Sequence, residues 1–381
     1  MKKFILRTLS YLLVAVLASV TTLAVSRFIG GGKLTVVQML LDQCFIGQID
    51  QKALEDAAAA AMVDALGDRW SHYQTAEEYK EYRDYVTNTY VGVGITIQTR
   101  EDGQGLDIIK VEPDGPADQA GIQVGDCLVS VDGQSIFGMT VTQVGDLIQA
   151  EEGAQVALGL LRQEQELSIS VTTKRLKTAV AKGQLLENGI GLVRIVNFDD
   201  RCASETIAVI EALMAQGAKS LIFDVRNNPG GYQHELVKLL DYLLPEGPLF
   251  RSQDYRGVEQ VDQSDANCLE IPMAVLINLH SYSAAEFFAA ALEEYDAAIL
   301  VGEKTFGKGY FQSTYELGDG SAVTLSIGKY FTPQGKSLAG VGLTPEVEVP
   351  VDEQTAAAIY AGTLEPQEDP QLQAAIRALK S

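Results

Sequence analysis

Three successive regions of the chain differ in the spacing of their hydrophobic residues. Residues 34–65 place apolar side chains at helical intervals, which predicts two helices. Residues 89–175 contain short strand-like runs separated by glycine turns, a pattern typical of a small β-rich module. From residue 176 onward, helical stretches alternate with runs that are apolar throughout, such as Ser220–Asp224 and Met273–Ile277, which predicts strands buried on both faces. The pattern therefore predicts a multidomain α/β protein.

The amino-terminal residues have the composition of a membrane-directed segment. Two lysines and an arginine precede residues 8–25, which are uncharged, mostly apolar and about long enough to cross a bilayer. Positively charged residues before such a segment stay in the cytoplasm, and the chain after the segment then lies outside the cytoplasm. We therefore expect a signal-anchor over residues 1–29, and a single-pass protein of the cell membrane with an extracytoplasmic body. A cleaved signal peptide is the alternative, since residues 24–26 resemble a cleavage site, and it would give a secreted protein.

Charge and cysteine usage narrow the possible partners. The 381 residues include 51 acidic and 29 basic ones, and the net charge of −22 argues against a nucleic-acid partner. The cysteines show no paired spacing, which predicts buried free thiols rather than a zinc site or a disulfide framework. They are Cys44, Cys127, Cys202 and Cys268. The three histidines do not cluster either, so we expect neither a metal nor another cofactor.

A serine lies at a predicted strand-to-helix turn after Met273–Ile277. The run Ser283-Ala-Ala-Glu286 fits a capping box, which predicts that a helix begins at Ser283. A sharp turn exposes such a serine, and the helix amides beside it favour a developing anion. Ser283 is therefore a candidate nucleophile.

We expect a lysine to be the base that activates this serine, because none of the three histidines has obvious catalytic-triad partners in the sequence. Burial disfavours the charged ammonium of a lysine, and a neutral lysine can accept a proton. Lys308 lies between two glycines in a loop after the predicted strand Ala298–Gly302, and Gln312 follows four residues later. Lys308 is the candidate base, with Lys304 as its rival.

These runs together resemble the signature of a known family. Ser283-Ala-Ala-Glu286 followed by Gly302-Glu-Lys-Thr-Phe-Gly-Lys308-Gly-Tyr-Phe-Gln312 is similar to the carboxyl-terminal processing (tail-specific) proteases, over residues 65–350. The resemblance implies that Ser283 is the nucleophile, Lys308 the general base and Gln312 the residue that orients the lysine. It also implies an α/β serine protease core with a crotonase-like layered sheet.

A second run resembles another motif of this family. Residues 224–231, Asp-Val-Arg-Asn-Asn-Pro-Gly-Gly, match Asp-Leu-Arg-x-Asn-Pro-Gly-Gly with valine in place of leucine. Adjacent glycines let the backbone turn its amides into a cavity. The resemblance implies that an amide of Gly230 or Gly231, together with the amide of Ala284, binds the oxyanion.

The β-rich module strongly resembles a PDZ domain through residues 115–126, Gly-Pro-Ala-Asp-Gln-Ala-Gly-Ile-Gln-Val-Gly-Asp. Its carboxylate loop would then lie just before, where glycines let successive N–H groups converge on a chain-terminal carboxylate. The substrate-binding residues expected there are Val91, Gly92, Val93, Gly94 and Ile95. A bound peptide would add a strand to the sheet and place its last side chain in an apolar pocket. The family usually has arginine and glycine near the end of the second PDZ helix, where this chain has Gln149 and Ala150.

These features predict five segments along the chain. They are a signal-anchor (1–29), an N-terminal helical region (30–88), a PDZ domain (89–175), a serine protease domain (176–350) and a C-terminal helical tail (351–381). The resemblance also implies a homodimer through the terminal helices.

The sequence thus predicts an exported serine endopeptidase that recognises the C-terminal tail of protein substrates through its PDZ domain. A Ser–Lys dyad would cleave the substrate through an acyl-enzyme. The expected partners are proteins with free, apolar C-termini, and the membrane through the N-terminal helix. One alternative, a non-catalytic PDZ scaffold on a protease-like fold, requires a missing dyad or a blocked oxyanion loop. Another, an acyl hydrolase of crotonase type, requires a nucleotide or acyl-carrier site, and the sequence has no phosphate-binding glycine-rich loop before a helix.

Overall fold

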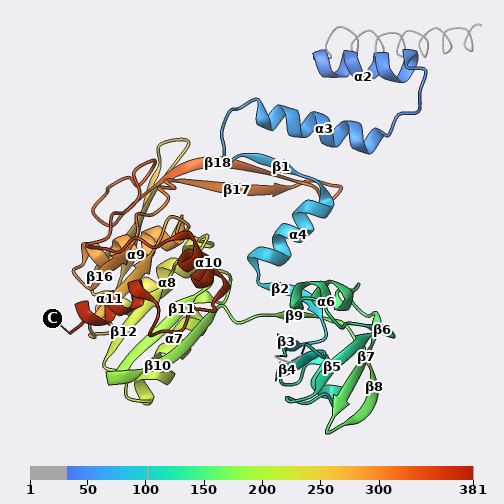
Figure 1. Cartoon of the computed structure of the whole chain (residues 1–381). Coiled ribbons are helices and arrows are strands. Elements are labelled where there is room, and N and C mark those ends of the chain that lie inside the picture. Colours follow the sequence, from blue (N-terminus) through green and yellow to red (C-terminus); the bar gives the residue numbers. More distant parts are fainter. Residues whose placement is uncertain (1–31, 101–102, 381) are drawn as a thin grey trace, which may run out of the picture. The chain divides into compact units, whose positions relative to one another are not determined.

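The computed structural model describes residues 32–100 and 103–380 of the chain (Figure 1). They fall into two compact units, which divide between Tyr73 and Gln74. The predicted signal-anchor, residues 1–29, lies outside the described residues. Within the two described ranges, no helix combines the length and the apolar character needed to cross a membrane.

The smaller unit is helical. Its helices α2 (Lys33–Cys44) and α3 (Gln51–Asp64) are the two that the spacing of residues 34–65 predicts. The carboxylate of Asp50 accepts a backbone N–H from the first turn of α3 at 3.0 Å, which explains where this helix begins. A short strand, β1 (His72–Gln74), spans the boundary to the second unit.

The larger unit begins with α4 (Ala76–Val86) and continues into the β-rich module. The module has a six-stranded sheet in the order β3-β4-β5-β7-β8, with β6 paired to β5. Its elements are β3 (Ile95–Thr99), β4 (Leu106–Val111), α5 (Pro116–Gln119), β5 (Cys127–Val131), β6 (Gln134–Ser135), α6 (Val141–Ile148), β7 (Gln155–Arg162) and β8 (Gln165–Thr172). Alternate residues of β7 are buried, as expected for a sheet with one face on a core. The PDZ domain in the predicted fold is confirmed.

Two strands at the ends of this module pair with each other. β2 (Thr89–Gly92) enters it and β9 (Lys174–Lys177) leaves it, and they form an antiparallel ladder of their own. Thr89 lies opposite Lys177 and Gly92 opposite Lys174. The segments on either side of the module therefore run side by side.

The remaining core is built on a second six-stranded sheet, in the order β10-β11-β12-β15-β16-β19. Its strands are β10 (Ala181–Leu186), β11 (Ile190–Ile195), β12 (Ser220–Asp224), β15 (Met273–Ile277), β16 (Ala298–Gly302) and β19 (Val347–Glu348). Only β10 runs antiparallel to its neighbour in this sheet. Every residue of β15 is buried, because helices cover both faces of the parallel strands.

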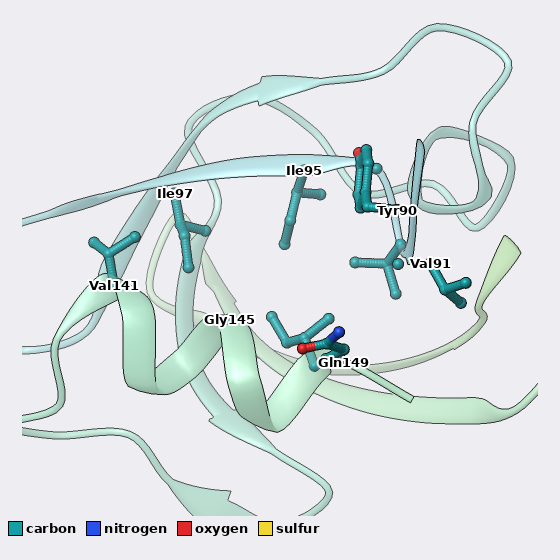
Figure 2. A pocket seen from close by; sticks show the side chains of 11 residues that line it. Tyr90, Val91, Ile95, Ile97, Val141, Gly145 and Gln149 are labelled. Carbon is teal, nitrogen blue, oxygen red and sulfur yellow. The ribbon is translucent and has the colours of Figure 1, made fainter. Parts of the chain in front are cut away.

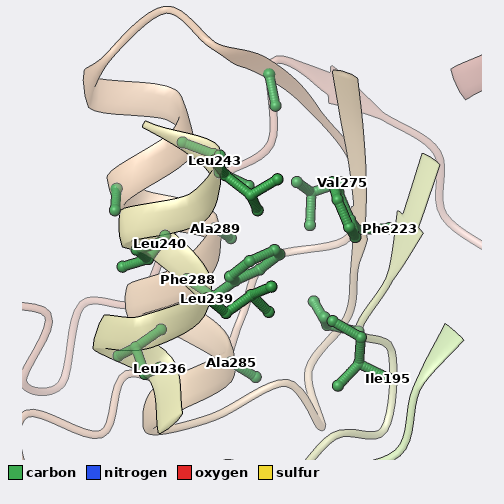
Figure 3. Packing of buried hydrophobic residues seen from close by; sticks show 14 of the residues in the cluster. Ile195, Phe223, Leu236, Leu239, Leu240, Leu243, Val275, Ala285, Phe288 and Ala289 are labelled. Carbon is green, nitrogen blue, oxygen red and sulfur yellow. The ribbon is translucent and has the colours of Figure 1, made fainter. Parts of the chain in front are cut away.

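The two faces of this sheet carry different helices. One face packs against α7 (Cys202–Ala215), α8 (Gln233–Leu243) and α9 (Ala284–Glu294). Phe223 and Val275 point to this side, and Phe288 meets the ring of Phe223 edge-on at 5.3 Å (Figure 3). The other face packs against α11 (Pro370–Ala378), and a last helix, α10 (Glu353–Ala361), precedes it. The C-terminal helix thus buries its apolar side on the core's own sheet.

A smaller antiparallel sheet carries the segment that contains Gln312. It includes β17 (Tyr310–Glu316), β18 (Ala322–Phe331), β13 (Gly247–Asp254) and β14 (Glu259–Ser264), paired in that order. Phe250 of β13 and Tyr330 of β18 pack against Phe287 of α9 at ring distances of 5.3 and 5.4 Å. These aromatic contacts fix the sheet against the helix that follows Ser283.

The cysteines are free thiols, as predicted. Cys127 is buried in the core of the PDZ domain, and Cys202 is buried in the core built on the second six-stranded sheet. The expectation of burial is wrong for Cys44, which is exposed because no residue of α2 is buried, and for Cys268, which is half-buried.

Candidate active site

Ser283 lies at the turn between β15 and α9, as the sequence predicts. It is the N-cap of α9 and has φ 58° and ψ −128°, a conformation that residues with a Cβ rarely adopt. Strain of this kind is typical of functional turns and costs about 1–3 kcal/mol. The residue is largely buried, at 7% exposure, so the expectation that the turn exposes this serine is wrong. The fold therefore holds a hydroxyl at the end of a central strand, beside the first amides of a helix.

Glu286 connects this turn to the lysine loop. Its side chain is fully buried and accepts hydrogen bonds from the N–H of Ser283 at 3.1 Å and from the Thr305 hydroxyl at 2.6 Å. The backbone N–H groups of Gly307 and Lys308 donate to the same carboxylate at 2.6 and 2.9 Å. Burial raises the pKa of Glu286, and these hydrogen bonds offset that effect only in part. One carboxylate thus joins the backbone of Ser283 to the backbone of Lys308.

The glycines beside Lys308 are needed for close packing. A Cβ on Gly309 would lie 2.6 Å from the Cβ of Ala339. Gly307 adopts φ 88°, and a Cβ there would lie 2.9 Å from the amide nitrogen of Gly342. The loop is therefore pressed against residues 338–342. Lys308 is half-buried in it, whereas Lys304 is exposed.

Gln312 lies on β17, four residues after Lys308. Its side-chain amide donates to the carbonyl of Tyr310 and to the hydroxyl of Ser326, both at 3.2 Å. These bonds fix the amide against β18. The orienting role of Gln312 toward Lys308 stays a prediction.

The Asn-Pro-Gly-Gly loop lies directly against Ser283. A Cβ on Gly230 would come within 2.7 Å of the Ser283 Cβ and 2.8 Å of the Ala284 amide nitrogen. The N–H of Gly230 donates to the Asn228 side chain at 2.8 Å, so it is committed within the loop. Among the described residues, the amides of Gly231 and Ala284 donate no hydrogen bond. This geometry does not suit Gly230 as a donor to an oxyanion and favours the other two predicted amides.

Hydrogen bonds between polar side chains and the backbone join the glycine loop to the serine turn. Asn278 bonds Asn227 twice, accepting its backbone N–H and donating to its side-chain oxygen, both at 3.0 Å. The hydroxyl of Ser281 is buried and donates to the carbonyl of Val225 at 2.8 Å. The glycine loop and the serine turn therefore form one connected element.

Sequence reasoning missed the role of Glu286 and of the residues that join the glycine loop to the serine turn. The capping-box pattern identifies Glu286 as a helix cap, and the Ser283 contact agrees with it. Its bonds to residues 305, 307 and 308 span about twenty positions, and no local pattern encodes them. Asn278 and Ser281 look like ordinary turn residues in the sequence, and only their contacts with the glycine loop distinguish them.

The PDZ domain contains a separate cavity of about 300 Å³ (Figure 2). All of the predicted loop residues, Val91, Gly92, Val93, Gly94 and Ile95, line it. Ile97 extends the lining along β3, and Val141, Gly145 and Ile148 of α6 form the opposite wall. The position where the family usually has arginine is also in the lining, as Gln149. The cavity is therefore a mainly apolar groove between a strand edge and a helix, closed at one end by a glycine-containing loop.

Across 32–100 and 103–380, no three histidine, cysteine or carboxylate side chains are grouped as a metal site would require.

The fold and these two sites define a PDZ-containing peptidase architecture, and comparison with known proteins agrees. Residues 189–349 match the model of peptidase family S41, and residues 108–162 match that of a PDZ domain. The match to peptidase family S41 thus covers most of the core region. The resemblance of the chain to carboxyl-terminal processing proteases is confirmed.

Individual relatives support the same assignment. A protein of Staphylococcus haemolyticus (strain JCSC1435), described as a probable CtpA-like serine protease, is 32% identical over 300 residues, which are 78% of this chain and 60% of that protein. The carboxy-terminal processing protease CtpA of Bacillus subtilis (strain 168) is 31% identical over 302 residues, 78% of this chain and 64% of that protein. The chain thus spans less than two thirds of the length of these relatives.

A solved structure shares the fold. It is a candidate S41 protease from Bacteroides fragilis NCTC 9343, with a TM-score of 0.52 and 15% identity over 84% of this chain and 90% of that chain.

Proposed function

We propose that the protein is a serine endopeptidase that cleaves polypeptides with a Ser283–Lys308 dyad. The observation that carries this proposal is the Glu286 carboxylate, which accepts the backbone N–H groups of both residues. A buried clamp of this kind holds two distant segments in fixed register. It gives a reason for the serine turn and the lysine loop to be built as one unit.

The reaction follows from the groups at this turn. The Ser283 hydroxyl attacks the carbonyl carbon of the scissile peptide bond while its proton passes to the uncharged amine of Lys308. The amides of Gly231 and Ala284 stabilise the oxyanion. The carbon–nitrogen bond then breaks, and Lys308 returns the proton to the leaving amine. Water attacks the acyl-enzyme ester, which releases the new C-terminus and regenerates Ser283.

The PDZ cavity would select the substrate. A free C-terminus fits the end of the groove that residues 91–95 close, because N–H groups of a glycine-containing loop can converge on a carboxylate. The preceding residues would pair with β3 as an added strand, and the last side chain would enter the apolar cavity. The expected substrates are therefore proteins with apolar C-terminal residues.

The amino-terminal segment supports a place outside the cytoplasm. Positive charge followed by the apolar run of residues 8–25 favours export with a single membrane anchor, and a cleaved signal peptide would give a secreted form. Protection of the body from protease added to intact cells would contradict either route.

Active-site labelling tests the dyad. A fluorophosphonate probe that reacts with activated serines should label the wild-type protein. Labelling should be lost in Ser283→Ala and in Lys308→Ala. Lys304→Ala is the matched control, since Lys304 lies exposed in the same loop, and it should label like the wild type. Equal labelling of the wild type and Ser283→Ala, or full labelling of Lys308→Ala, would contradict the proposal.

Competition tests tail recognition. Two peptides with the same apolar C-terminal sequence, one ending in a free carboxylate and one in an amide, should compete unequally with a tailed substrate. Equal competition would rule out carboxylate recognition by the PDZ domain without affecting the dyad.

A further inference from the structure

The glycine loop beside Ser283 is held from the opposite face of the core sheet. Residues of a strand point alternately to its two faces, and β12 and its continuation follow this rule. Phe223 and Val225 point to the side of α9, whereas Asp224 and Arg226 reach the side of α11. Arg226 is the first residue after Asp224 and Val225 in the run that leads to Gly231, so its side chain anchors the start of that loop.

The guanidinium of Arg226 has a partner for each of its five N–H bonds. Nε donates to one oxygen of Asp224 at 2.9 Å, and Nη2 donates to the other at 2.8 Å. The remaining donors go to the C-terminal helix region, to Asp369 at 3.2 and 2.8 Å and to Gln371 at 3.0 Å. Arg226, Asp224 and Asp369 are all nearly buried. A charge-assisted network with every donor satisfied fixes the guanidinium in one orientation.

Asp369 comes from a part of the chain far from the site. It is the N-cap of α11, and its Oδ1 accepts the N–H groups of Gln371 and Leu372, both at 3.0 Å. The helix itself packs on β15 and β16 (Figure 1). The bidentate contact of Asp369 with Arg226 therefore ties a well-packed helix to the loop at the nucleophile.

We propose that Asp369 is a positioning residue of the active site, which acts through Arg226 to hold the Gly231 amide at the oxyanion. The inference rests on the proposed function. The far end of the loop has its own support, because the carbonyl of Gly230 accepts the N–H of Phe198 at 2.8 Å and the N–H of Tyr232 donates to the Phe198 carbonyl at 2.7 Å. Between these two anchors the Gly231 amide has a fixed direction. Although burial opposes ionisation, Arg226 keeps the pKa of Asp224 below its usual value, so the network stays charged.

Asp369→Asn separates this role from helix capping. Asparagine caps helices as well as aspartate, so α11 keeps its N-cap. Its amide group, however, would meet the Arg226 donors with N–H bonds of its own, and the ion pair is lost. Asp352→Asn is the matched control, because Asp352 caps the neighbouring helix α10 in the same way, through the N–H of Thr355 at 2.7 Å.

Cleavage kinetics with casein as the substrate test the positioning role of Asp369. Titration of a tail peptide measures binding separately. Asp369→Asn should lower kcat about 10- to 100-fold, the scale expected when a catalytic group moves by a fraction of an ångström to 1 Å. Its KM, its tail-peptide Kd and its circular dichroism should stay close to those of the wild type. Asp352→Asn should match the wild type in every readout.

Other outcomes overturn the inference. An Asp369→Asn enzyme with wild-type kcat would remove the positioning role, and an equal loss in Asp352→Asn would reduce it to capping. A loss of kcat that merely parallels loss of peptide binding and of the folded signal would leave Asp369 with a structural role only. If wild type and Ser283→Ala both leave casein uncut, the proposed function itself fails, which is a separate result.

A second variant decides the question if Asp369→Asn does not fold. Gln371→Leu removes the neutral hydrogen bond to Nη1 of Arg226 and leaves both carboxylates in place. It also removes the bonds that the Gln371 amide donates to the Val349 carbonyl at 2.9 Å and to Glu303 at 3.4 Å. It should lower kcat a few-fold at unchanged KM. An unchanged kcat in a folded Gln371→Leu enzyme would contradict the inference.

Discussion

The PDZ cavity and the serine site are built in opposite ways. The cavity is mostly apolar, and its lining comes from two stretches of one small module, residues 90–97 and 141–149. The serine site is a buried polar network that joins three loops of the core and reaches the C-terminal helix through Arg226. A binding groove thus needs one strand edge and one helix, whereas a site for bond cleavage needs groups fixed from several directions. Binding and chemistry should therefore be separable by mutation.

The largest separable effect is expected at Glu286. Glu286→Gln replaces two accepting oxygens with one oxygen and one NH₂ group, so two of the four donors lose their partner or face another donor. We expect kcat to fall on the order of 100-fold as Ser283 and Lys308 lose their common register. Binding of a tail peptide should not change.

Glu293→Gln is the control for this change, because it makes the same substitution on the same helix outside the network. Steady-state kinetics and peptide titration of both variants test the prediction. A Glu286→Gln enzyme that retains wild-type kcat would show that the clamp does not matter for chemistry.

A smaller effect, confined to binding, is expected at Gly145. This residue lines the PDZ cavity from α6, and no atom lies within 4 Å of the Cβ that a side chain would add. Gly145→Leu should fill the space that the proposed function assigns to the last substrate side chain, whose burial is worth about 1.5–3 kcal/mol. The tail-peptide Kd should rise about tenfold or more. Fluorophosphonate labelling of Ser283 should be unchanged.

Gly145→Ala provides the graded control, since a methyl group occupies less of the cavity. Both variants should melt no lower than the wild type, because glycine in a helix interior costs up to about 1 kcal/mol. Isothermal titration and thermal melts measure the two effects. Unaltered peptide affinity in Gly145→Leu would place the tail elsewhere.

A gain of a few-fold is expected at Gln149, which lines the same cavity. Gln149→Arg adds a positive charge near the expected carboxylate, and an exposed ion pair is worth about 0.2–1 kcal/mol. The peptide with a free C-terminus should bind more tightly at low salt, and the gain should shrink at high salt. The amidated peptide serves as control, and an equal gain for both peptides would show that the charge does not act on the carboxylate.

The smallest effect concerns the pH dependence of folding. Burial raises the pKa of Glu286 above its usual value of 4.5, so the folded state holds this proton more tightly than the unfolded state. The corresponding contribution to the free energy of unfolding is fully present below the unfolded pKa and is lost as pH rises through the folded pKa. Glu286→Gln has no such term. Urea denaturation at a series of pH values above 4.5 should therefore show the wild type losing stability relative to the variant as pH rises. A difference that is independent of pH, or one that changes in the other direction, would contradict the sign.

The sequence predicts most of what is local in this fold. The apolar run Met273–Ile277 becomes a fully buried strand, and Ser283 becomes the N-cap of the following helix. The glycine-containing stretch of residues 91–95 lines the PDZ cavity as the resemblance implies. In each case the information lies within about ten neighbouring residues, in the period of the hydrophobic pattern or in turn chemistry.

Hydrogen-bond geometry and long-range contacts account for what the sequence does not reveal. Which of Gly230 and Gly231 has a free amide for the oxyanion depends on the Asn228 side chain, because it accepts the Gly230 N–H. The order of residues in this loop does not reveal that bond. The C-terminal helix looks like a separate tail in the sequence, yet Leu372 and Ala375 are buried on the core sheet. A helical period shows that a face is apolar, and it does not show which surface covers that face.

The ladder between β2 and β9 has a consequence for how such a chain can change over time. Because Thr89 and Lys177 are paired in this ladder, the chain enters and leaves the PDZ domain at nearly the same point. A domain whose two ends lie close together can be replaced as a unit, because its replacement leaves the path of the surrounding chain unchanged. Under the proposed function, specificity for the substrate tail can therefore diversify through exchange of the residues between Thr89 and Lys177, while the residues around Ser283 are inherited unaltered.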